Sequence, residues 1–515
     1  MNQVFDRSSG YRPFERNSVV AFAILSGVIL WLIPKHVIVR GDDFGYVESL
    51  LATLQNGNWT SSEWLGPFNL PLPFLGAAVY SLGENFWMAS LGVTAVISGL
   101  NFFLLARWLS LCGWPSGRCH AAALAVALSP VWLNKSLEYT CIPPGLALIL
   151  GALMLWQTKR IGLFFAVVWV ALANRQSAVC LLVFPLVSLV REWTADRKCS
   201  PRIMTGFLLS MVFVGFLLWV VPRTYAREVW SVQRPASLQS FLGNVLLGLF
   251  ICAGSAAAWL ALRGENMKDI LKENLKRPIF SILAMGFGVW LMFAETAFLN
   301  CEPPGLASFS PIILTVAVVA GAWLYPWHRP FSLEMAAFVA GYVLLVSWRG
   351  QWWDYYLLEP LLVTSLVSRS IAGLKANRHP GFAVMAVVMG LLYGGYLSKM
   401  LLESEARVFV FETEMRAGRL KIADLSDAPF GYLGWKLFHY AQIRGDLHPK
   451  LSDFLRYVEI TRFVPANGQY AVWHRIDHRS IHPSGEKWEL PPDYRDRRFP
   501  LSNDEWSEEV SRSSP

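Results

Sequence analysis

The stretch FWMASLGVTAVISGLNFFLLA, residues 86–106, decides the class of this protein. It has no charged side chain, and a helix of about 20 mainly apolar residues crosses a bilayer core of about 30 Å. Similar runs recur up to residue 397 and predict about thirteen transmembrane helices. They lie near residues 18–34, 86–106, 119–133, 142–157, 161–174, 176–190, 205–221, 240–262, 279–298, 306–324, 333–347, 357–371 and 381–397.

The composition excludes several other classes. Of the 515 residues, 54% are hydrophobic and only 16% are charged, whereas soluble domains carry about 25% charged residues. The net charge of +8 does not indicate a nucleic-acid partner, because the Lys and Arg residues are spread between apolar runs rather than gathered on one soluble face. The seven cysteines include no C-x-x-C pair, so neither a zinc cluster nor a disulfide framework is indicated.

The distribution of Lys and Arg predicts the orientation of the chain. With the N-terminus in the cytoplasm, most of the basic residues up to residue 380 fall on inward-facing loops, as the positive-inside rule requires. An odd number of spans then places the C-terminus outside the cytoplasm. We expect an integral multi-pass protein, in a bacterial inner (plasma) membrane, with a cytoplasmic N-terminus at residues 1–17, a transmembrane domain at 18–398 and an extracytoplasmic domain at 399–515.

The predicted C-terminal domain is small and of mixed structure. Charges become frequent from Lys399 onward, and no later run is long enough to cross a membrane. Residues 433–454 have the pattern of one or two amphipathic helices, and residues 469–476 alternate as a strand does. The fold class expected from the sequence is therefore an all-α polytopic membrane protein with a small extracytoplasmic α+β tail.

The first outward loop, residues 35–85, carries the best candidate for chemistry. It contains RGDDFGY at residues 40–46, with two adjacent carboxylates, Asp42 and Asp43, close to Arg40. A Gly-Asp pair is common in solvated turns. The alternative is a general base at the membrane surface that takes a proton from an attacking hydroxyl. The loop continues with Trp, Phe and Pro residues that suit helices lying in the membrane interface.

A resemblance to a known family emerges from several motifs in order. These are DDFGY at 42–46, GNW at 57–59, ALSP at 127–130 followed by Glu138, ANRQS at 173–177 and WDYYLLEP at 353–360. Their sequence resembles the GT-C glycosyltransferases, especially the dolichyl-phosphate-mannose protein mannosyltransferases and the lipid A aminoarabinose transferases. Two positions depart from that pattern. Residues 68–73 read FNLPLP where many relatives carry Lys or His before a Pro pair, and Asp354 stands where an Arg is expected, although Arg349 is close.

The resemblance implies a GT-C-like enzyme that moves a hexosyl or pentosyl group. The donor would be a sugar on a polyprenyl phosphate, and the acceptor a hydroxyl of a lipid, glycan or protein outside the cytoplasm. It implies Asp42 as the catalytic base, with Asp43 as the second candidate. The substrate-binding residues implied are Arg40, Tyr46, Lys135, Glu138, Arg175, Arg349, Asp354 and Tyr356.

No cofactor is expected. A divalent cation held by Asp42 with an outer acid is an open alternative, because hard cations need several converging oxygen ligands. The outer acids are Glu138, Glu295, Glu302, Asp354 and Glu359.

Two other functions remain open at this point. A multi-pass secondary transporter would also place acids at the ends of its spans, and such carriers are built from repeats. The match of CIPPGLA at 141–147 with CEPPGLA at 301–307 is the one hint of a repeat. Two similar helix starts with Pro in the first turn explain it first, and a disulfide between Cys141 and Cys301 is the next alternative. A non-catalytic membrane protein of envelope assembly is the second alternative, and it predicts that Asp42 is dispensable.

Overall fold

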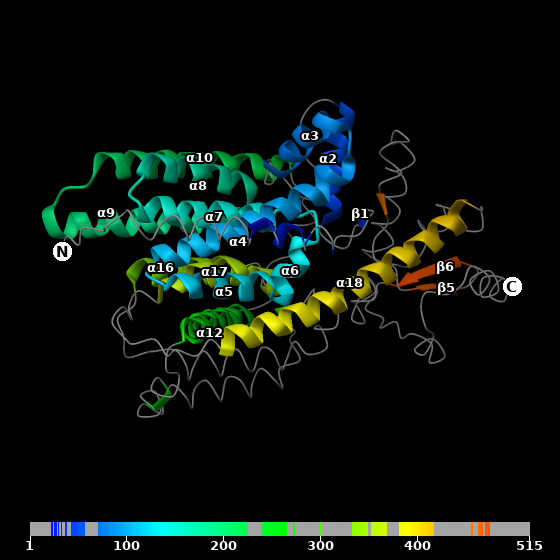
Figure 1. Ribbon diagram of the computed structural model, residues 1–515. Coiled ribbons are helices and arrows are strands. Elements are labelled where there is room, and N and C mark those ends of the chain that lie inside the picture. Colours follow the sequence, from blue (N-terminus) through cyan, green and yellow to red (C-terminus); the bar gives the residue numbers. More distant parts are fainter. Residues whose placement is uncertain are drawn as a thin grey trace.

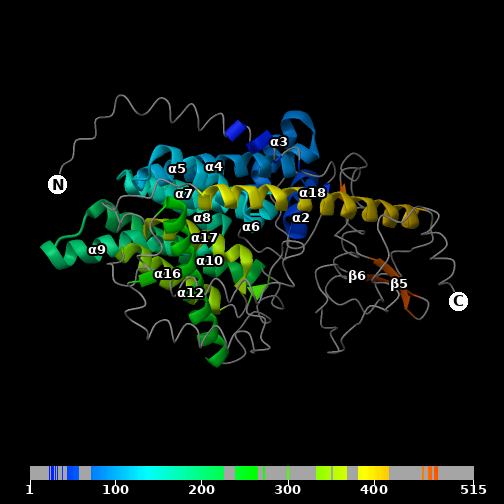
Figure 2. The same ribbon diagram turned by 60° about the horizontal axis from the view of Figure 1, so that its bottom comes forward.

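The structure is a computed structural model dominated by helices (Figures 1 and 2). It describes parts of residues 22–32, and residues 37–38, 43–56, 71–224, 238–264, 271–272, 299–300, 332–348, 352–367, 381–416, 455–456, 462–466 and 469–473. Its main helices are α2 (Asp43–Asn56), α3 (Pro71–Gly83), η1 (Met88–Gly92), α4 (Val93–Leu111), α5 (Ser116–Ala127), α6 (Pro130–Ser136), α7 (Ile142–Gln157), α8 (Ile161–Asn174), η2 (Gln176–Leu182), α9 (Val183–Asp196), α10 (Pro201–Thr224), α12 (Leu238–Arg263), α16 (Leu333–Trp348), η4 (Asp354–Leu357), α17 (Leu358–Thr364) and α18 (Gly381–Arg416).

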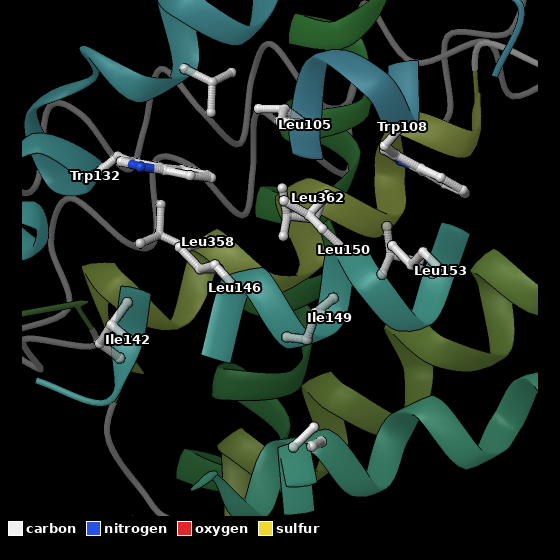
Figure 3. Packing of buried hydrophobic residues seen from close by; sticks show 14 of the residues in the cluster. Leu105, Trp108, Trp132, Ile142, Leu146, Ile149, Leu150, Leu153, Leu358 and Leu362 are labelled. Carbon is white, nitrogen blue, oxygen red and sulfur yellow. The ribbon is translucent and has the colours of Figure 1, made fainter. Parts of the chain in front are cut away.

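The centre of the bundle is an apolar layer on α7 (Figure 3). Leu146 and Leu150 of this helix are buried and belong to one core with Leu105 of α4 and Leu362 of α17. Lipid tails are as apolar as leucine, so helices in a bilayer associate through close packing and interhelical hydrogen bonds. One such bond runs from Trp108 Nε1 to Ser365 Oγ over 2.8 Å, and tryptophans make similar bonds from α12 and α8.

Several helices turn apolar side chains outward. Leu208, Val212 and Trp219 of α10 are exposed, as are Val384 and Leu392 of α18. Outward apolar side chains of this kind are expected on helices that face lipid. Five described stretches are long and apolar enough to cross a membrane: Met88–Leu111, Gln176–Ala195, Pro201–Trp219, Phe241–Arg263 and Gly381–Ser398. The predicted helical, polytopic membrane fold is therefore confirmed for the described residues, while the total of thirteen spans stays a prediction.

The predicted boundaries agree with the helices in several places and differ clearly at two. The spans expected at 142–157 and 161–174 coincide with α7 and α8. The single span expected at 119–133 is wrong, because α5 ends at Ala127 and α6 starts at Pro130. Ser129 has φ −60° and ψ 145°, the extended conformation that a following proline favours. The spans expected at 279–298 and 306–324 lie outside the described residues.

The last span continues well beyond its predicted end at residue 397. α18 runs from Gly381 to Arg416, so it crosses the domain boundary predicted at residue 398. No Pro or Gly interrupts residues 397–416, and Gly418 is the next helix-breaking residue. In Figure 1 the second half of α18 projects past the bundle toward β5 and β6.

Two helices of the first outward loop pack against the bundle. The middle of α3 approaches the bundle and α2 closely at Gly76, where an added Cβ atom would lie 2.6 Å from the Ala89 carbonyl oxygen, 2.7 Å from the Tyr139 hydroxyl and 3.0 Å from Leu50 Cδ1. Tyr139 is fully buried and donates a hydrogen bond to the Leu72 carbonyl over 3.1 Å. Burial raises the pKa of Tyr139 well above the ordinary tyrosine value, so the hydroxyl stays a donor.

This close approach predicts that Gly76→Ala is destabilising. The methyl group would press on backbone and on a buried hydroxyl, and overpacking of this kind costs about 1–3 kcal/mol. We expect a lower thermal unfolding midpoint for the detergent-solubilised variant. Gly83→Ala is the matched control in the same helix, since nothing lies within 4 Å of its added Cβ. Equal midpoints for the two variants would show that α3 does not pack against Ala89 and Tyr139 as described.

Short strands connect distant parts of the chain. β1 (Val37–Ile38) pairs in parallel with β4 (Leu455–Arg456), and β2 (Leu299–Asn300) pairs in parallel with β3 (Trp352–Trp353). In the tail, β5 (Arg462–Ala466) and β6 (Gln469–Trp473) form an antiparallel pair. β6 covers the first part of the strand predicted at 469–476, and residues 474–476 lie outside the described residues. The amphipathic helices predicted at 433–454 lie outside the described residues.

The pairing of β1 with β4 is open to a direct test. Ile38 and Arg456 are Cα partners across this pair, and neighbouring strands lie about 4.8 Å apart, within the Cα separation of about 4.4–6.8 Å that a disulfide bridges. Ile38→Cys with Arg456→Cys is expected to give a crosslinked chain that migrates faster on a non-reducing gel. Ile38→Cys with Arg462→Cys is the control, and crosslinking of the control to the same extent would argue against the pairing.

Candidate active site

The helix that follows the Asp42-Asp43 pair is fixed to the bundle by Tyr46. Asp43 is the first residue of α2, whereas Asp42 and Arg40 lie outside the described residues, as does the side chain of Asp43. Tyr46 is buried, and its hydroxyl donates a hydrogen bond to Cys141 Sγ over 2.8 Å. A helix rises 1.5 Å per residue, so the start of α2 lies about 4.5 Å along its axis from Tyr46.

Cys141 is the meeting point of three helices. It occupies the N-cap position of α7. Its sulfur accepts a hydrogen bond from the Tyr46 hydroxyl of α2, and its carbonyl accepts one from Asn174 Nδ2 at the end of α8, over 3.0 Å. We call this end of the bundle, where α2 and α6 lie (Figure 2), the outer end, after the predicted orientation. The Cys301 partner considered for Cys141 lies outside the described residues, so a disulfide there stays a prediction.

Lys135 and Glu138 form an enclosed ion pair. Lys135 Nζ lies 2.8 Å from Glu138 Oε2, and the two side chains are only 6% and 8% exposed. Asn134 Nδ2 donates to the other carboxylate oxygen over 3.0 Å. Buried lysine and glutamate are rare unless paired, so this pair indicates a polar interior at the outer end, beside η4, which α6 contacts.

Arg175 lies at a sharp break in the chain. α8 ends at Asn174, η2 begins at Gln176, and Arg175 between them is extended, with φ −158° and ψ 135°. Its Nη1 lies 2.7 Å from Glu359 Oε1, and its guanidinium carbon lies 5.3 Å from the centre of the Tyr356 ring, a cation–π geometry. The spans expected at 161–174 and 176–190 meet at this position, and the helix is interrupted there.

Electrostatics keep Arg175 charged. Burial by itself would lower the pKa of Arg175, but the adjacent Glu359 carboxylate opposes this and raises the pKa above the ordinary arginine value. The arginine side chain remains 13% exposed, whereas Glu359 is 1% exposed. A permanent cation at the outer end can bind an anionic group such as a phosphate.

The aromatic ring that contacts the Arg175 guanidinium belongs to Tyr356, in the WDYYLLEP motif at residues 353–360. Tyr356 belongs to η4, and its backbone carbonyl accepts a hydrogen bond from the buried Tyr342 hydroxyl of α16 over 2.7 Å. Asp354 begins the same short helix, but its side chain lies outside the described residues, as does Arg349. The backbone of Tyr356 is thus fixed by Tyr342, while its ring faces the Arg175 guanidinium.

The structure brings part of the predicted site together. Tyr46, Arg175 and Tyr356 gather around the start of α7, and Lys135 pairs with Glu138 nearby. From the sequence, Glu359 was expected only as an outer acid and Ser177 was not a candidate, yet Glu359 forms an ion pair with Arg175 and accepts a hydrogen bond from Ser177. A carboxylate opening a long apolar stretch was the signal that could have marked Glu359 as the partner of a buried cation.

The described residues contain no cluster suited to a metal. Among them, no three His, Cys, Asp or Glu side chains gather closely enough to hold a metal ion. Asp42, Glu295 and Glu302 lie outside the described part of the chain, so a divalent cation bound through them remains a proposal.

The fold is that of a polytopic helical membrane protein, and the outer end of its bundle contains the ion pairs Lys135–Glu138 and Arg175–Glu359. No known protein family matches the chain, and no curated protein matches it either. Among solved structures, the chain is similar to that of ArnT from Cupriavidus metallidurans bound to undecaprenyl phosphate, with 15% sequence identity and a TM-score of 0.38. The match covers 76% of this chain and 72% of that chain.

Proposed function

We propose that the protein is a GT-C-like glycosyltransferase that moves a sugar from a polyprenyl-phosphate donor to an acceptor hydroxyl on the extracytoplasmic side of the membrane. One observation supports this most. Tyr46, on the helix that begins at Asp43, donates a hydrogen bond to Cys141, and Asn174, which directly precedes Arg175, donates a hydrogen bond to the same cysteine. The helix that follows the candidate base in the sequence and the residue before a permanent cation are therefore hydrogen-bonded to the same cysteine.

The proposed reaction is a displacement at the anomeric carbon of the sugar. Asp42 accepts the proton of the acceptor hydroxyl as its oxygen attacks that carbon. The bond between the anomeric carbon and the phosphate oxygen breaks, and its electron pair leaves with the polyprenyl phosphate. Adjacent carboxylates raise each other's proton affinity, so Asp43 would help Asp42 act as a base near neutral pH.

Negative charge on the departing phosphate needs a fixed positive group. Of the two described cations at the outer end, Arg175 is the better candidate, because Lys135 is enclosed with its own carboxylate and is less exposed. The guanidinium offers several N–H donors in one plane, which match phosphate oxygens better than an ammonium does. In this proposal Tyr46, Glu138 and Tyr356 shape the pocket beside these groups, and Arg40, Arg349 and Asp354 complete it.

Sugar transfer itself is the decisive assay. Membranes that contain the chain are incubated with a radiolabelled pool of polyprenyl-phosphate sugars, and label is followed into lipid, glycan and protein fractions. Membranes from cells without the chain are the control. Label that moves only in the presence of the chain supports the enzyme. If the labelled sugar stays on its lipid, the transferase proposal is wrong, and flux of solutes across vesicles tests the transporter alternative.

A further inference from the structure

Glu359 occupies an unusual place for a carboxylate in an apolar bundle. It lies in the first turn of α17 and is 1% exposed. Its Oε1 atom receives both Arg175 Nη1, over 2.7 Å, and the Ser177 hydroxyl, over 2.8 Å. Its Oε2 atom is buried and has no hydrogen-bond partner among the described residues. Burying a charge this deeply is expensive unless it is paired and hydrogen-bonded, and Arg175 and Ser177 supply these contacts.

The contacts of Glu359 and Tyr356 all involve the short segment that contains Arg175 and Ser177. The two donors to Glu359 are Arg175, at the break between α8 and η2, and Ser177, in the first turn of η2. The Tyr356 ring that faces Arg175 comes from η4, just before Glu359. The two segments are far apart in sequence, since Ser177 and Glu359 are separated by 182 positions. Carboxylate and aromatic ring together restrict the guanidinium in both its direction and its plane.

The exposure of the pair is unequal. The Glu359 side chain is buried, whereas 13% of the Arg175 side-chain surface is exposed. A ligand at the outer end can therefore reach the arginine but not the carboxylate. The carboxylate also offsets the charge of the arginine, so the pair attracts an anion less strongly than a lone cation would, and its advantage lies in fixed geometry.

We propose that Glu359 is a positioning residue of the transfer reaction: with Ser177 and Tyr356, it holds the Arg175 guanidinium where the phosphate of the donor leaves. This inference rests on the proposed transferase function. It assigns Glu359 no contact with the substrate, and its effect reaches the reaction only through Arg175.

Positioning of this kind has a kinetic signature. A displacement of about 1 Å at a group that stabilises the transition state costs about a hundredfold in rate. Loss of the Glu359 charge frees the cation to move but leaves it more attractive to anions. We therefore expect Glu359→Gln to lower kcat by about tenfold to a hundredfold while KM for the lipid donor stays the same or falls.

The test is a double-mutant cycle in the full-length protein. kcat and KM are measured for the natural chain, Glu359→Gln, Arg175→Met and the double variant, all with matched expression and monodisperse elution. If Glu359 acts through Arg175, its substitution has no further effect once Arg175 is gone, because coupled residues are not additive. Ser177→Ala, a milder change that keeps both charges, is expected to lower kcat a few fold and decides the question if Glu359→Gln does not fold.

Glu334→Gln is the matched control. Glu334 of α16 forms an ion pair with Arg191 of α9, and we expect this variant to transfer at the natural rate. Additive losses in the cycle, or an unchanged kcat in both Glu359→Gln and Ser177→Ala, would overturn the positioning role while leaving the transferase proposal intact. Absence of transfer by the natural chain would instead overturn the proposed function and this inference with it.

Discussion

Asp42→Asn is expected to reduce sugar transfer by about two to four orders of magnitude, the usual contribution of a general base. The reaction needs a group that takes the proton of the acceptor hydroxyl, and an amide cannot do so near neutral pH. The measurement is the initial rate of label transfer in membranes at matched expression, with the thermal unfolding midpoint of the purified variant as the check on folding.

This substitution separates chemistry from helix capping. Asp42 directly precedes α2, whose first residue is Asp43, and Asp and Asn cap helix N-termini about equally well. The asparagine variant therefore keeps the side chain that a cap requires and removes only the negative charge. Asp43→Asn is the companion variant, and a larger loss there would exchange the roles of the two residues. Natural rates in both variants would favour a solvated turn and a non-catalytic protein.

Apolar patterns predicted those helices that begin or end at strong signals. α7 starts at a Pro pair in its first turn, and α8 ends where Asn174 and Arg175 interrupt the apolar run, so both were predictable to within a residue. The span expected at 119–133 failed because hydropathy averages over Ser129 and Pro130, which are too few to lower the mean yet enough to break the helix. α18 was underestimated because an apolar pattern reports lipid contact rather than helix length.

The site was predictable only as separate pieces. Motif order identified Tyr46, Arg175 and Tyr356, but no local pattern tells which side chains meet across the bundle. The Tyr46 contact with Cys141 spans 95 positions, and that of Ser177 with Glu359 spans 182. The role of Glu359 depends on such a long-range contact, and for this reason the sequence showed only an acid at the start of an apolar stretch.

Arg175→Lys is expected to lower kcat by about a hundredfold, at the lower end of what loss of one transition-state hydrogen-bond donor costs. Lysine keeps the positive charge and can still pair with Glu359, so the buried carboxylate is not left alone and the bundle should fold. It lacks the planar set of N–H donors and the flat face that packs on Tyr356. Single-turnover transfer with saturating lipid donor measures the chemical step directly.

The control for this change is Arg191→Lys, which alters the same residue type in an ion pair with Glu334 on α9 and α16 and should leave the rate unchanged. The pattern across the variants then identifies what Arg175 contributes. A loss in kcat at constant KM means that its donors act mainly on the departing phosphate, as proposed, because an interaction made only in the transition state changes kcat alone. A rise in KM with kcat intact would mean that Arg175 binds the donor equally in the ground state, and Glu359 would then position a binding group rather than one that assists departure. An unchanged rate would show that any positive charge suffices there, and the stacked, hydrogen-bonded geometry around Arg175 would have to be explained by folding alone.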